Sequence, residues 1–523
     1  MSNLNASSSL SFSSFLAGLS LHERGLLIAF MLLKLVLVFT VPLTGDEAYF
    51  IVWGQELSLG YYDHPPMVGW LLYLLSGIGD HLIIYRLFAY IAAIVMAYLL
   101  YQTLQFHPKI NQKVVFYVAF AFLVSPISLM FVVTANDTVL VFFAVVAFFF
   151  YAKTLAHPSL INALLAGLFL GLAFLSKYFA VFMLLGLFLY SLVYIKQHAW
   201  KWLAIMTAVV LLFVAENLYF NATNCWNNIL FNFFSRTTNN TFNIGNVVSY
   251  VVMILLLLSP LALFYLWKSL KIFKEKPSGE RVLFPVLKQV LFATLPLLAV
   301  LFFVSFTNPV GLHWPLLSVT LLYLLYALLS PNQLQILYLF NGYSSLVVGV
   351  VLLVALAFVN QLIPASQKHH VAVYTQPEAV CAHLPTSTFF TLGYSSQSAL
   401  SYHCQNDDVH VFMSTSKYGR EDDKKTDFKA LNGQDLNVFV THEKDIKKLR
   451  PFFAELNVKP LSIQDDLTYY LIEGQGFNYA LYREQILTVV NKSFYTAPDW
   501  FPDVSGWLGA ESCRFKTQYG FEE

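Results

Sequence analysis

The segment from Gly45 to Trp70, GDEAYFIVWGQELSLGYYDHPPMVGW, contains several acids and one histidine but neither lysine nor arginine. Its titratable residues are Asp46, Glu47, Glu56, Asp63 and His64. Apolar stretches flank the segment, so these acids lie beside a membrane if the stretches span one. Carboxylates at such a position act as a general base or hold a cation, whereas a phosphate group needs basic residues.

A second explanation of these acids requires no chemistry. Loops on the outer side of a membrane lack Lys and Arg, so Asp46 and Glu47 can simply obey this bias at the level of the lipid headgroups. Two neighbouring features favour a site instead. Asp63 precedes a histidine and two rigid prolines, and the basic residues Arg236 and His313 occur in other loops of the same set.

The composition indicates an integral membrane protein. The chain has 523 residues, of which 57% are hydrophobic and 12% charged, whereas soluble domains have about 25% charged residues. The net charge is +1, and no basic cluster marks a compact domain, which excludes nucleic acid as a partner. The four cysteines show no metal-ligand spacing, so we expect no structural zinc site.

Apolar stretches along the first two thirds of the chain predict a polytopic α-helical membrane protein. Between Gln289 and Gln367 there is no Asp, Glu, Lys or Arg, which leaves room for several spans. We expect about eleven spans, within a range of roughly 9 to 13, near residues 24–42, 81–104, 114–133, 138–155, 159–176, 178–195, 201–218, 247–267, 289–306, 315–330 and 338–363.

The cations of the short loops predict the orientation, because loops rich in Lys and Arg stay in the cytoplasm. One set of alternate loops contains His22, Arg24, Lys109, Lys113, Lys153, Lys196, Lys201, Lys268, Lys271, Lys274, Lys276 and Arg281. The opposite set, including loops 43–80 and 217–246, has few cations beyond Lys177 and Arg236, so it is expected to face outward. An odd number of spans puts the chain after Lys368 on the outer side too.

Residues 368–523 are expected to form a small soluble α/β domain on the outer face, after a membrane domain at 1–367. The stretches DVHVFM, LNVFVTH and LTYYLI alternate like strands, and KYGREDDKKTDFK indicates a solvated charged run. Cys381 and Cys404 both occur in this domain. An oxidising compartment would permit a disulfide between them, but the sequence does not decide whether it forms.

Several motifs resemble the bacterial GT-C glycosyltransferases, a group that includes the lipid A aminoarabinose transferases and relatives of the protein O-mannosyltransferases. The motifs are GDEAYF, YYDHPPMVGW, TANDTVLVFF, GLFLGLAFLSKY, ENLYFNATNCWNNILFNFFSR and NPVGLHWP, spread over most of Leu26–Pro331. The resemblance implies a GT-C architecture in the bacterial inner membrane, with an active site that faces the periplasm. It also implies transfer of a sugar from a polyprenyl-phosphate carrier to a lipid A, surface-glycan or protein acceptor.

The resemblance also implies roles for individual residues. Asp46 matches the catalytic aspartate of the family and is expected to act as a general base or to orient the acceptor. Glu47 is the second catalytic candidate, with a structural role as the alternative, because adjacent like charges repel. Arg236 resembles the arginine that binds the donor phosphate, which suits its planar, doubly donating fork.

Further candidates for binding the donor phosphate are Lys177, His313 and His64. The alternatives are an interfacial lysine that reaches toward the headgroups for Lys177, and a turn histidine packed on Pro65 for His64. Asp63 stands where related lipid A transferases carry a metal-binding glutamate. A divalent metal cation of unknown identity is therefore an expected cofactor candidate, with Asp63 as its ligand.

A transporter or flippase of a lipid-linked sugar is the alternative function, because it would also use interfacial charges and an apolar groove. Transporters carry ionisable or broken positions at mid-span in both halves of the chain. Here the polar candidates concentrate in the outer loops, and the long charge-free stretch lies in the second half. A membrane anchor that displays residues 368–523 would not need this many spans. The sequence therefore favours the enzyme.

Overall fold

The computed structural model describes residues 18–194, 198–236, 241–275, 285–463, 467–502 and 513–521. They divide into two compact units, each made of several chain segments. Unit 1 contains the described residues up to Thr40 and those of Tyr85–Phe213 and Asn239–Leu356. Unit 2 contains the described residues of Val41–Ile84 and Val214–Thr238, and those from Ala357 onward.

The division into compact units differs from a single boundary near residue 367. Residues of both expected outer loops, 43–80 and 217–246, group with the C-terminal residues in unit 2. Two buried side chains explain this grouping, because Tyr62 and Phe231, at 1% and 2% exposure, belong to the same hydrophobic cluster as the C-terminal sheet. The assignment of 1–367 and 368–523 as membrane and periplasmic domains stays a prediction.

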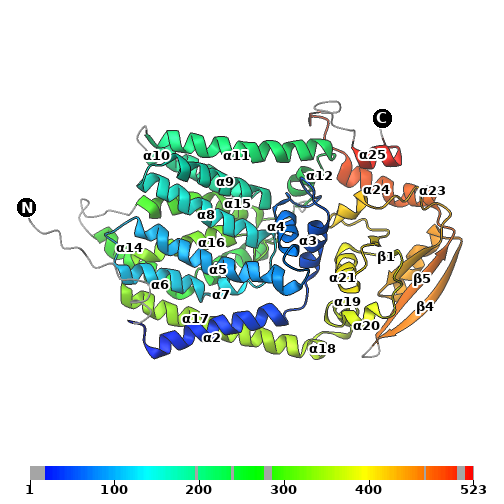
Figure 1. The fold of residues 1–523 in the computed structure, drawn as a ribbon, viewed down its shortest axis with the longest axis horizontal. Helices are drawn as coiled ribbons and strands as arrows, with labels where there is room; N and C mark the ends of the chain where they lie inside the picture. Colours follow the sequence, from blue (N-terminus) through cyan, green and yellow to red (C-terminus); the bar gives the residue numbers. More distant parts are fainter. Residues whose placement is uncertain are drawn as a thin grey trace, which may run out of the picture. The chain divides into compact units, whose positions relative to one another are not determined.

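Unit 1 consists of helices (Figure 1). They are α2 (Leu21–Thr40), α5 (Leu82–Gln105), α6 (Gln112–Leu123), α7 (Pro126–Leu129), α8 (Asn136–Ala156), α9 (Leu160–Ser176), α10 (Ala180–Tyr194), α11 (His198–Thr223), α13 (Ile244–Leu257), α14 (Pro260–Glu275), α15 (Pro285–Val304), α16 (Leu316–Leu322), the 3-10 helix η3 (Tyr323–Leu328) and α17 (Pro331–Ala357). α5 begins and α11 ends in unit 2. α8 packs against α9, and α10 packs against α15.

Within the described residues, five helices are long and apolar enough to cross a membrane, or up to seven spans if each of two bent helix pairs counts as one. The five are α5, α8, the Trp200–Thr223 part of α11, α15 and α17. α9, α10 and other apolar helices are shorter. The helices indicate a membrane protein, but the expected count of about eleven spans is not confirmed.

Chain breaks account for part of the difference in span count. The span expected at 247–267 is two helices, α13 and α14, which meet at an angle of 81°. Ser259 lies between them with a φ of 62°, and Pro260 begins α14. Proline lacks the N–H that would continue the ladder of the preceding helix, so the chain turns there. Lys196, Lys276, Arg281 and residues 237–240 lie outside the described residues.

Unit 2 combines short helices with one sheet. Its helices are α3 (Gly45–Gln55), α4 (Met67–Ser76), α12 (Asn227–Ile229), η1 (Leu230–Ser235), α18 (Val359–Leu362), α19 (Ala365–Thr375), α20 (Pro377–Cys381), α21 (Tyr394–Cys404), η4 (Arg420–Lys424), α22 (Glu443–Leu449), η5 (Arg450–Phe452), α23 (Tyr479–Tyr482), η6 (Arg483–Leu487), α24 (Thr488–Val490), η7 (Asn491–Tyr495) and α25 (Arg514–Tyr519). η1, η6 and η7 are π-helical, whereas η4 and η5 are 3-10 helices.

The sheet of unit 2 has the strand order β2-β1-β3-β5-β4. The strands are β1 (Phe389–Thr391), β2 (Val409–Val411), β3 (Leu436–Val440), β4 (Glu455–Ile463) and β5 (Leu467–Gln475). β1 runs parallel to β2 and β3, whereas β5 is antiparallel to β3 and β4. The strands predicted in DVHVFM, LNVFVTH and LTYYLI are confirmed as β2, β3 and β5.

The prediction of a solvated charged run at KYGREDDKKTDFK is wrong. Arg420, Glu421 and Asp422, in the middle of this run, are only 4%, 8% and 7% exposed. The guanidinium of Arg420 donates to both carboxylate oxygens of Asp423, at 2.7 and 2.8 Å, and to the backbone oxygens of Ser414 and Ser416. Because the charges satisfy one another, the segment can be buried, and the pattern of charges alone does not reveal this pairing.

Candidate active site

The first candidate acids lie at the beginning of α3. Thr44 caps this helix: its hydroxyl accepts from the Glu47 backbone N–H at 3.2 Å, and its own backbone N–H donates to the Glu47 carboxylate at 3.4 Å. This capping box satisfies two free donors at the helix start. Glu47 is 1% exposed, whereas Asp46 is exposed. The geometry therefore gives Glu47 a structural function and leaves Asp46 accessible.

Asp46 contacts a tyrosine from the C-terminal part of unit 2. The Tyr394 hydroxyl, at the start of α21, donates to Oδ1 of Asp46 at 3.2 Å. Burial raises the pKa of Tyr394, and the negative charge of Asp46 raises it further. The negative charge of Asp63 also raises the pKa of Tyr394, so both carboxylates act on this hydroxyl. The phenol remains a neutral donor at neutral pH, which suits a group that orients a carboxylate.

Asp63 is buried, in contrast to Asp46, with 6% exposure. Its Oδ1 accepts from the Gly419 backbone N–H at 3.4 Å, and its carboxylate is hydrogen-bonded to the Tyr49 hydroxyl. Burial raises the pKa of Asp63 to about 7, although these hydrogen bonds and the positive charge of Arg236 act in the opposite direction. Asp63 is therefore a carboxyl group held inside the unit rather than an exposed loop acid.

Asn232 links Arg236 to the Asp63 loop. The Asn232 side chain donates to the backbone oxygen of Asp63 at 2.8 Å, and its own oxygen accepts from Arg236 at 3.5 Å. Lys417 donates to the backbone oxygens of Ser235 and Arg236, at 2.9 and 3.2 Å. Arg236 is the C-cap of η1, and its guanidinium lies over the Phe231 ring. The two motifs that the sequence separates by more than 160 residues thus share one network in unit 2.

Five residues around these candidates were not identified from the sequence, namely Asn232, Lys417, Tyr49, Tyr394 and Glu421. Tyr49 follows Asp46 by three positions in the same motif, and its hydroxyl accepts from the Glu421 backbone N–H at 3.2 Å. The Glu421 carboxylate accepts from the Tyr62 backbone N–H at 2.6 Å and pairs with Lys424 at 2.9 Å. The helical spacing from Asp46 could have identified Tyr49. Tyr394 and Glu421 carry no such signal, because they come from a region without a recognised motif.

His64 makes the contacts of a turn residue. Its backbone oxygen accepts from the Tyr61 N–H at 3.0 Å, and its ring lies 6.3 Å from the Trp53 ring. The hydrogen bond closes the turn that carries Asp63. A function of His64 in phosphate binding stays a prediction.

The residues around Asp63 do not fit a metal centre. Within the ranges that the structure describes, no three or more His, Cys, Asp and Glu side chains gather in a way that could hold a metal ion. Asp63 offers a single carboxyl group whose Oδ1 already accepts a backbone N–H. Divalent cations of the expected kind need several ligands. No step of the chemistry is therefore derived through a metal, and a divalent cofactor stays a prediction.

Lys177 and His313 belong to unit 1, where both lie close to the carboxylate of Asp137. Lys177 donates to both oxygens of Asp137, at 2.8 and 2.9 Å, and its side chain is 3% exposed. His313 Nε2 lies 3.7 Å from the same carboxylate, with a side chain that is 46% exposed. Asp137 lies in the first turn of α8 rather than in a loop. Lys177 is thus a buried, paired cation and not a lysine that reaches for the headgroups.

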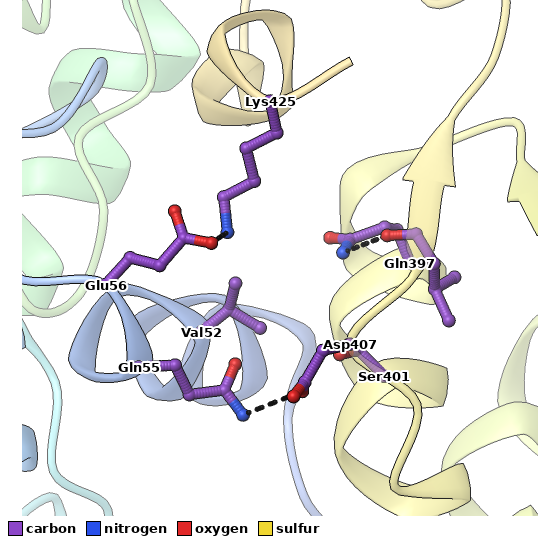
Figure 2. A pocket seen from close by; sticks show the side chains of 8 residues that line it. Val52, Gln55, Glu56, Gln397, Ser401, Asp407 and Lys425 are labelled. Carbon is purple, nitrogen blue, oxygen red and sulfur yellow. Dashed lines mark hydrogen bonds and ion pairs between the residues drawn. The ribbon is translucent and has the colours of Figure 1, made fainter. Parts of the chain in front are cut away.

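A polar cavity of about 210 Å³ lies in unit 2 between α3 and α21 (Figure 2). In Figure 2, Gln55 contacts Asp407 at 3.4 Å, and Lys425 pairs with Glu56 at 3.1 Å. Glu56 and Lys425 also line a second cavity of about 190 Å³. In the larger cavity, Gln55 pairs with Asp407 and Lys425 pairs with Glu56, so we assign this cavity no part in the chemistry. Glu56 nevertheless has a partner that the sequence did not indicate.

Both disulfides lie in unit 2. Cys381 pairs with Cys404, which settles the question that the sequence left open, and Cys225 pairs with Cys513. The second disulfide joins the segment that carries Arg236 to the C-terminal end of the chain, across a sequence separation of 288 residues. It holds the Arg236 segment within the unit by a covalent bond in addition to its hydrogen bonds.

Comparison with known proteins relates the chain to glycosyltransferases. Residues 63–220 match the family model described as dolichyl-phosphate-mannose-protein mannosyltransferase. The lipid A galacturonosyltransferase RgtD of Rhizobium johnstonii is 31% identical over 144 residues, which cover 27% of this chain and 30% of that protein. The match therefore spans less than a third of the curated relative. The family-model match at residues 63–220 lies within the segment in which the motifs of the resemblance were found.

Two crystal structures share the fold over most of the chain. ArnT from Cupriavidus metallidurans in the apo state has a TM-score of 0.59 and 14% identity, and the match covers 86% of this chain and 98% of that one. The same protein bound to undecaprenyl phosphate has a TM-score of 0.59 and 15% identity, with coverage of 87% and 98%. At this identity the match shows the fold alone. The comparisons together confirm the resemblance to the GT-C glycosyltransferases.

Proposed function

We propose that this protein is a glycosyltransferase of the bacterial inner membrane that moves a sugar from a polyprenyl-phosphate carrier to an acceptor at the periplasmic face. The acceptor is lipid A, a surface glycan or a protein. The family match, the lipid A galacturonosyltransferase relative and the ArnT-like fold support the reaction class. ArnT was crystallised with undecaprenyl phosphate, which supports a lipid-phosphate donor for this chain.

The observation that carries the proposal is a pair of hydrogen-bonded groups in unit 2, Asp46–Tyr394 and Asp63–Asn232–Arg236. The two groups meet where the ring of Tyr394 packs against that of Tyr49, which is hydrogen-bonded to Asp63. They provide an exposed carboxylate, Asp46, and a cation, Arg236, on segments that lie far apart in the sequence. Tyr394 contacts Asp46, and Asn232 joins Arg236 to the loop of Asp63. A sugar transfer from a lipid phosphate requires both kinds of group. One accepts a proton from the acceptor, and the other meets the charge of the departing phosphate.

In the proposed reaction, the acceptor oxygen forms a bond to the anomeric carbon of the sugar. The bond from that carbon to the carrier phosphate breaks, and its electron pair leaves with the polyprenyl phosphate. The proton of an acceptor hydroxyl moves to the Asp46 carboxylate, which Tyr394 orients. If the acceptor is an ionised phosphate, as in lipid A, no proton moves and Asp46 only orients the acceptor.

Arg236 binds the donor phosphate in this proposal. Its guanidinium offers two parallel donors to a phosphate group, and charge on the phosphate oxygens increases as the glycosidic bond breaks. Glu47 supports Asp46 by capping α3, and Tyr49 holds the Asp63 carboxyl inside the unit. Lys177 and His313 are secondary candidates for the phosphate, because both already lie next to the carboxylate of Asp137 in unit 1.

The alternative function is a transporter or flippase, which would move the lipid-linked sugar across the membrane without transferring the sugar to an acceptor. Mass spectrometry of lipid A and surface glycans from cells with and without the gene distinguishes the two. We expect one glycan species to lose a single sugar residue when the gene is absent. Purified protein in lipid should transfer that sugar from a polyprenyl-phosphate donor to the isolated acceptor. Movement of the donor across the bilayer without any transfer to an acceptor would contradict the proposal.

A further inference from the structure

Five aromatic residues of unit 2 form a surface cluster, here called the aromatic patch: Trp226, Phe233, Phe234, Trp500 and Phe501. Three ring contacts join two distant segments, namely Trp226–Phe501 at 5.3 Å, Phe234–Trp500 at 6.2 Å and Phe234–Phe501 at 5.9 Å. The neighbouring rings of Trp500 and Phe501 lie 4.7 Å apart. Phe233, Phe234 and Trp500 are 64%, 42% and 74% exposed. Large exposed apolar clusters of this kind mark interaction sites.

The chain connects the aromatic patch directly to a membrane-spanning helix. The apolar part of α11 runs from Trp200 to Thr223. Trp226 follows three residues later, so it lies at most about 11 Å along the chain from the end of the span. Leu218 and Tyr219, in the last turns of α11, are 46% and 42% exposed, as expected for a helix that faces lipid. The patch therefore begins where the span leaves the apolar part of the bilayer.

The composition of the aromatic patch fits the boundary between acyl chains and headgroups. Trp rings are amphipathic and gather at this level of a membrane. Arg236 caps the helix that carries Phe233 and Phe234, and Lys417 binds the backbone of the same turn. Cations next to apolar rings match the phosphates of the lipid headgroups. Asp499 is exposed beside Trp500 and would remain on the water side.

We propose that the aromatic patch is a second membrane contact, which inserts into the headgroup region of the outer leaflet and holds η1 at the depth of the lipid phosphates. The ring contacts of Phe234 with Trp500 and Phe501 fasten the Trp500 segment to the Arg236 segment, so both enter the lipid surface together. The membrane contact stands on the patch alone. Its consequence, that Arg236 meets the donor phosphate at this depth, rests on the proposed function.

Photo-crosslinking of the full chain tests the membrane contact. A benzophenone-bearing phenylalanine analogue replaces Trp500 in protein reconstituted into nanodiscs of phosphatidylethanolamine and phosphatidylglycerol. Because Trp500 is 74% exposed, the replacement should not disturb folding. We expect a phospholipid adduct by mass spectrometry. The same analogue at Val458, which is 40% exposed on β4, is the matched control and should give no lipid adduct.

Other adducts would overturn the proposal. A crosslink from position 500 to a second copy of the chain would make the patch a protein interface. A crosslink only within the same chain, or equal lipid adducts at positions 500 and 458, would show that the patch has no specific membrane contact.

A functional measurement separates this inference from the proposed function. Trp500→Ser should raise the KM for a long-chain polyprenyl-phosphate sugar in lipid several-fold, while the KM for a short, water-soluble donor and the kcat stay unchanged. An equal rise for both donors would contradict a function in membrane placement. Lipid adducts at position 500 together with full donor use by Arg236→Ala would keep the membrane contact but refute the phosphate-binding role of Arg236.

Discussion

The hydroxyl of Tyr394 donates a hydrogen bond to Oδ1 of Asp46 at 3.2 Å, although the two residues are 348 positions apart in the chain. The contact brings a residue of the C-terminal segment to the exposed acid in the first turn of α3. A neutral phenol that donates to a carboxylate fixes its orientation without removing its charge. The C-terminal residues of unit 2 thus contribute to the candidate site itself.

Asp46→Asn should be inserted and folded normally, yet transfer sugar at no more than roughly a hundredth of the normal rate. The amide keeps nearly the same volume and can still bond to Tyr394, but it cannot take a proton, and general-base catalysis contributes about 10²–10⁴-fold. Initial rates of transfer to a hydroxyl acceptor provide the measurement.

Asp80→Asn is the control for Asp46→Asn. Asp80 is exposed at the other end of the same expected outer loop, and it should keep near-normal activity. If both variants were equally active, the acids of this loop would serve only the topology of the chain.

Tyr394→Phe should lower the transfer rate by about tenfold, because a hydrogen bond to a charged group contributes at least about 1.5 kcal/mol. The loss should be in kcat and should be smaller than that of Asp46→Asn. Tyr418→Phe, at an exposed tyrosine of unit 2, should have no effect. An unchanged kcat in Tyr394→Phe would remove this tyrosine from the site.

Arg236→Ala and Arg236→Lys should both raise the KM for the donor. Lysine keeps the charge but loses the planar fork that binds a phosphate with two donors, so the lysine variant should rescue only part of the loss. Rates at subsaturating donor measure this effect. Arg450→Ala, at an exposed arginine outside the network, should match the wild type. Normal donor use by Arg236→Ala would exclude Arg236 from phosphate binding.

Glu56→Gln should stay near wild type in both activity and stability, even though Glu56 pairs with Lys425. The side chains of this pair are 65% and 24% exposed, and exposed ion pairs contribute only about 0–1 kcal/mol. A thermal midpoint within a few degrees of wild type is expected. A tenfold loss of transfer would instead assign the cavity beside α3 to the acceptor.

His442 should lower the stability of the protein as the pH drops below about 6.5, the usual pKa of a histidine, whereas Asp63, whose pKa burial raises to about 7, acts in the opposite direction over the same range. Burial lowers the pKa of His442, and the neighbouring His370, His369 and Lys444 lower it further, against the opposite effect of Asp445. The unfolded chain then takes up a proton that the folded protein resists, so acid favours unfolding. Thermal midpoints of wild type and His442→Gln, compared between pH 7 and pH 5.5, measure the fall due to His442, because Asp63 titrates in both proteins.

His442→Gln should flatten this fall in thermal midpoint, because the glutamine does not titrate. His383→Gln, at an exposed histidine, should leave it unchanged. An identical pH profile in His442→Gln and wild type would show that other groups cause the acid sensitivity.

The sequence by itself determined the membrane class, three of the strands and the reaction class. Hydrophobicity and alternation are local properties of consecutive residues, so the apolar helices and the strands at Val409–Val411, Leu436–Val440 and Leu467–Gln475 could be predicted. The set of motifs from GDEAYF to NPVGLHWP pointed to the right group of proteins, since the comparisons confirm that resemblance.

Only the tertiary structure decided which residues meet. The pair of Asp46 with Tyr394 and the group of Asp63, Asn232 and Arg236 depend on contacts between segments more than 160 residues apart, and no local pattern encodes such contacts. The pairing of Arg420 with Asp423 turned a run predicted to be solvated into a buried one, because opposite charges at the right geometry replace water. The positive φ of Ser259 and the ring of Pro260 bend the span expected at 247–267, since backbone geometry rather than hydropathy ends a helix.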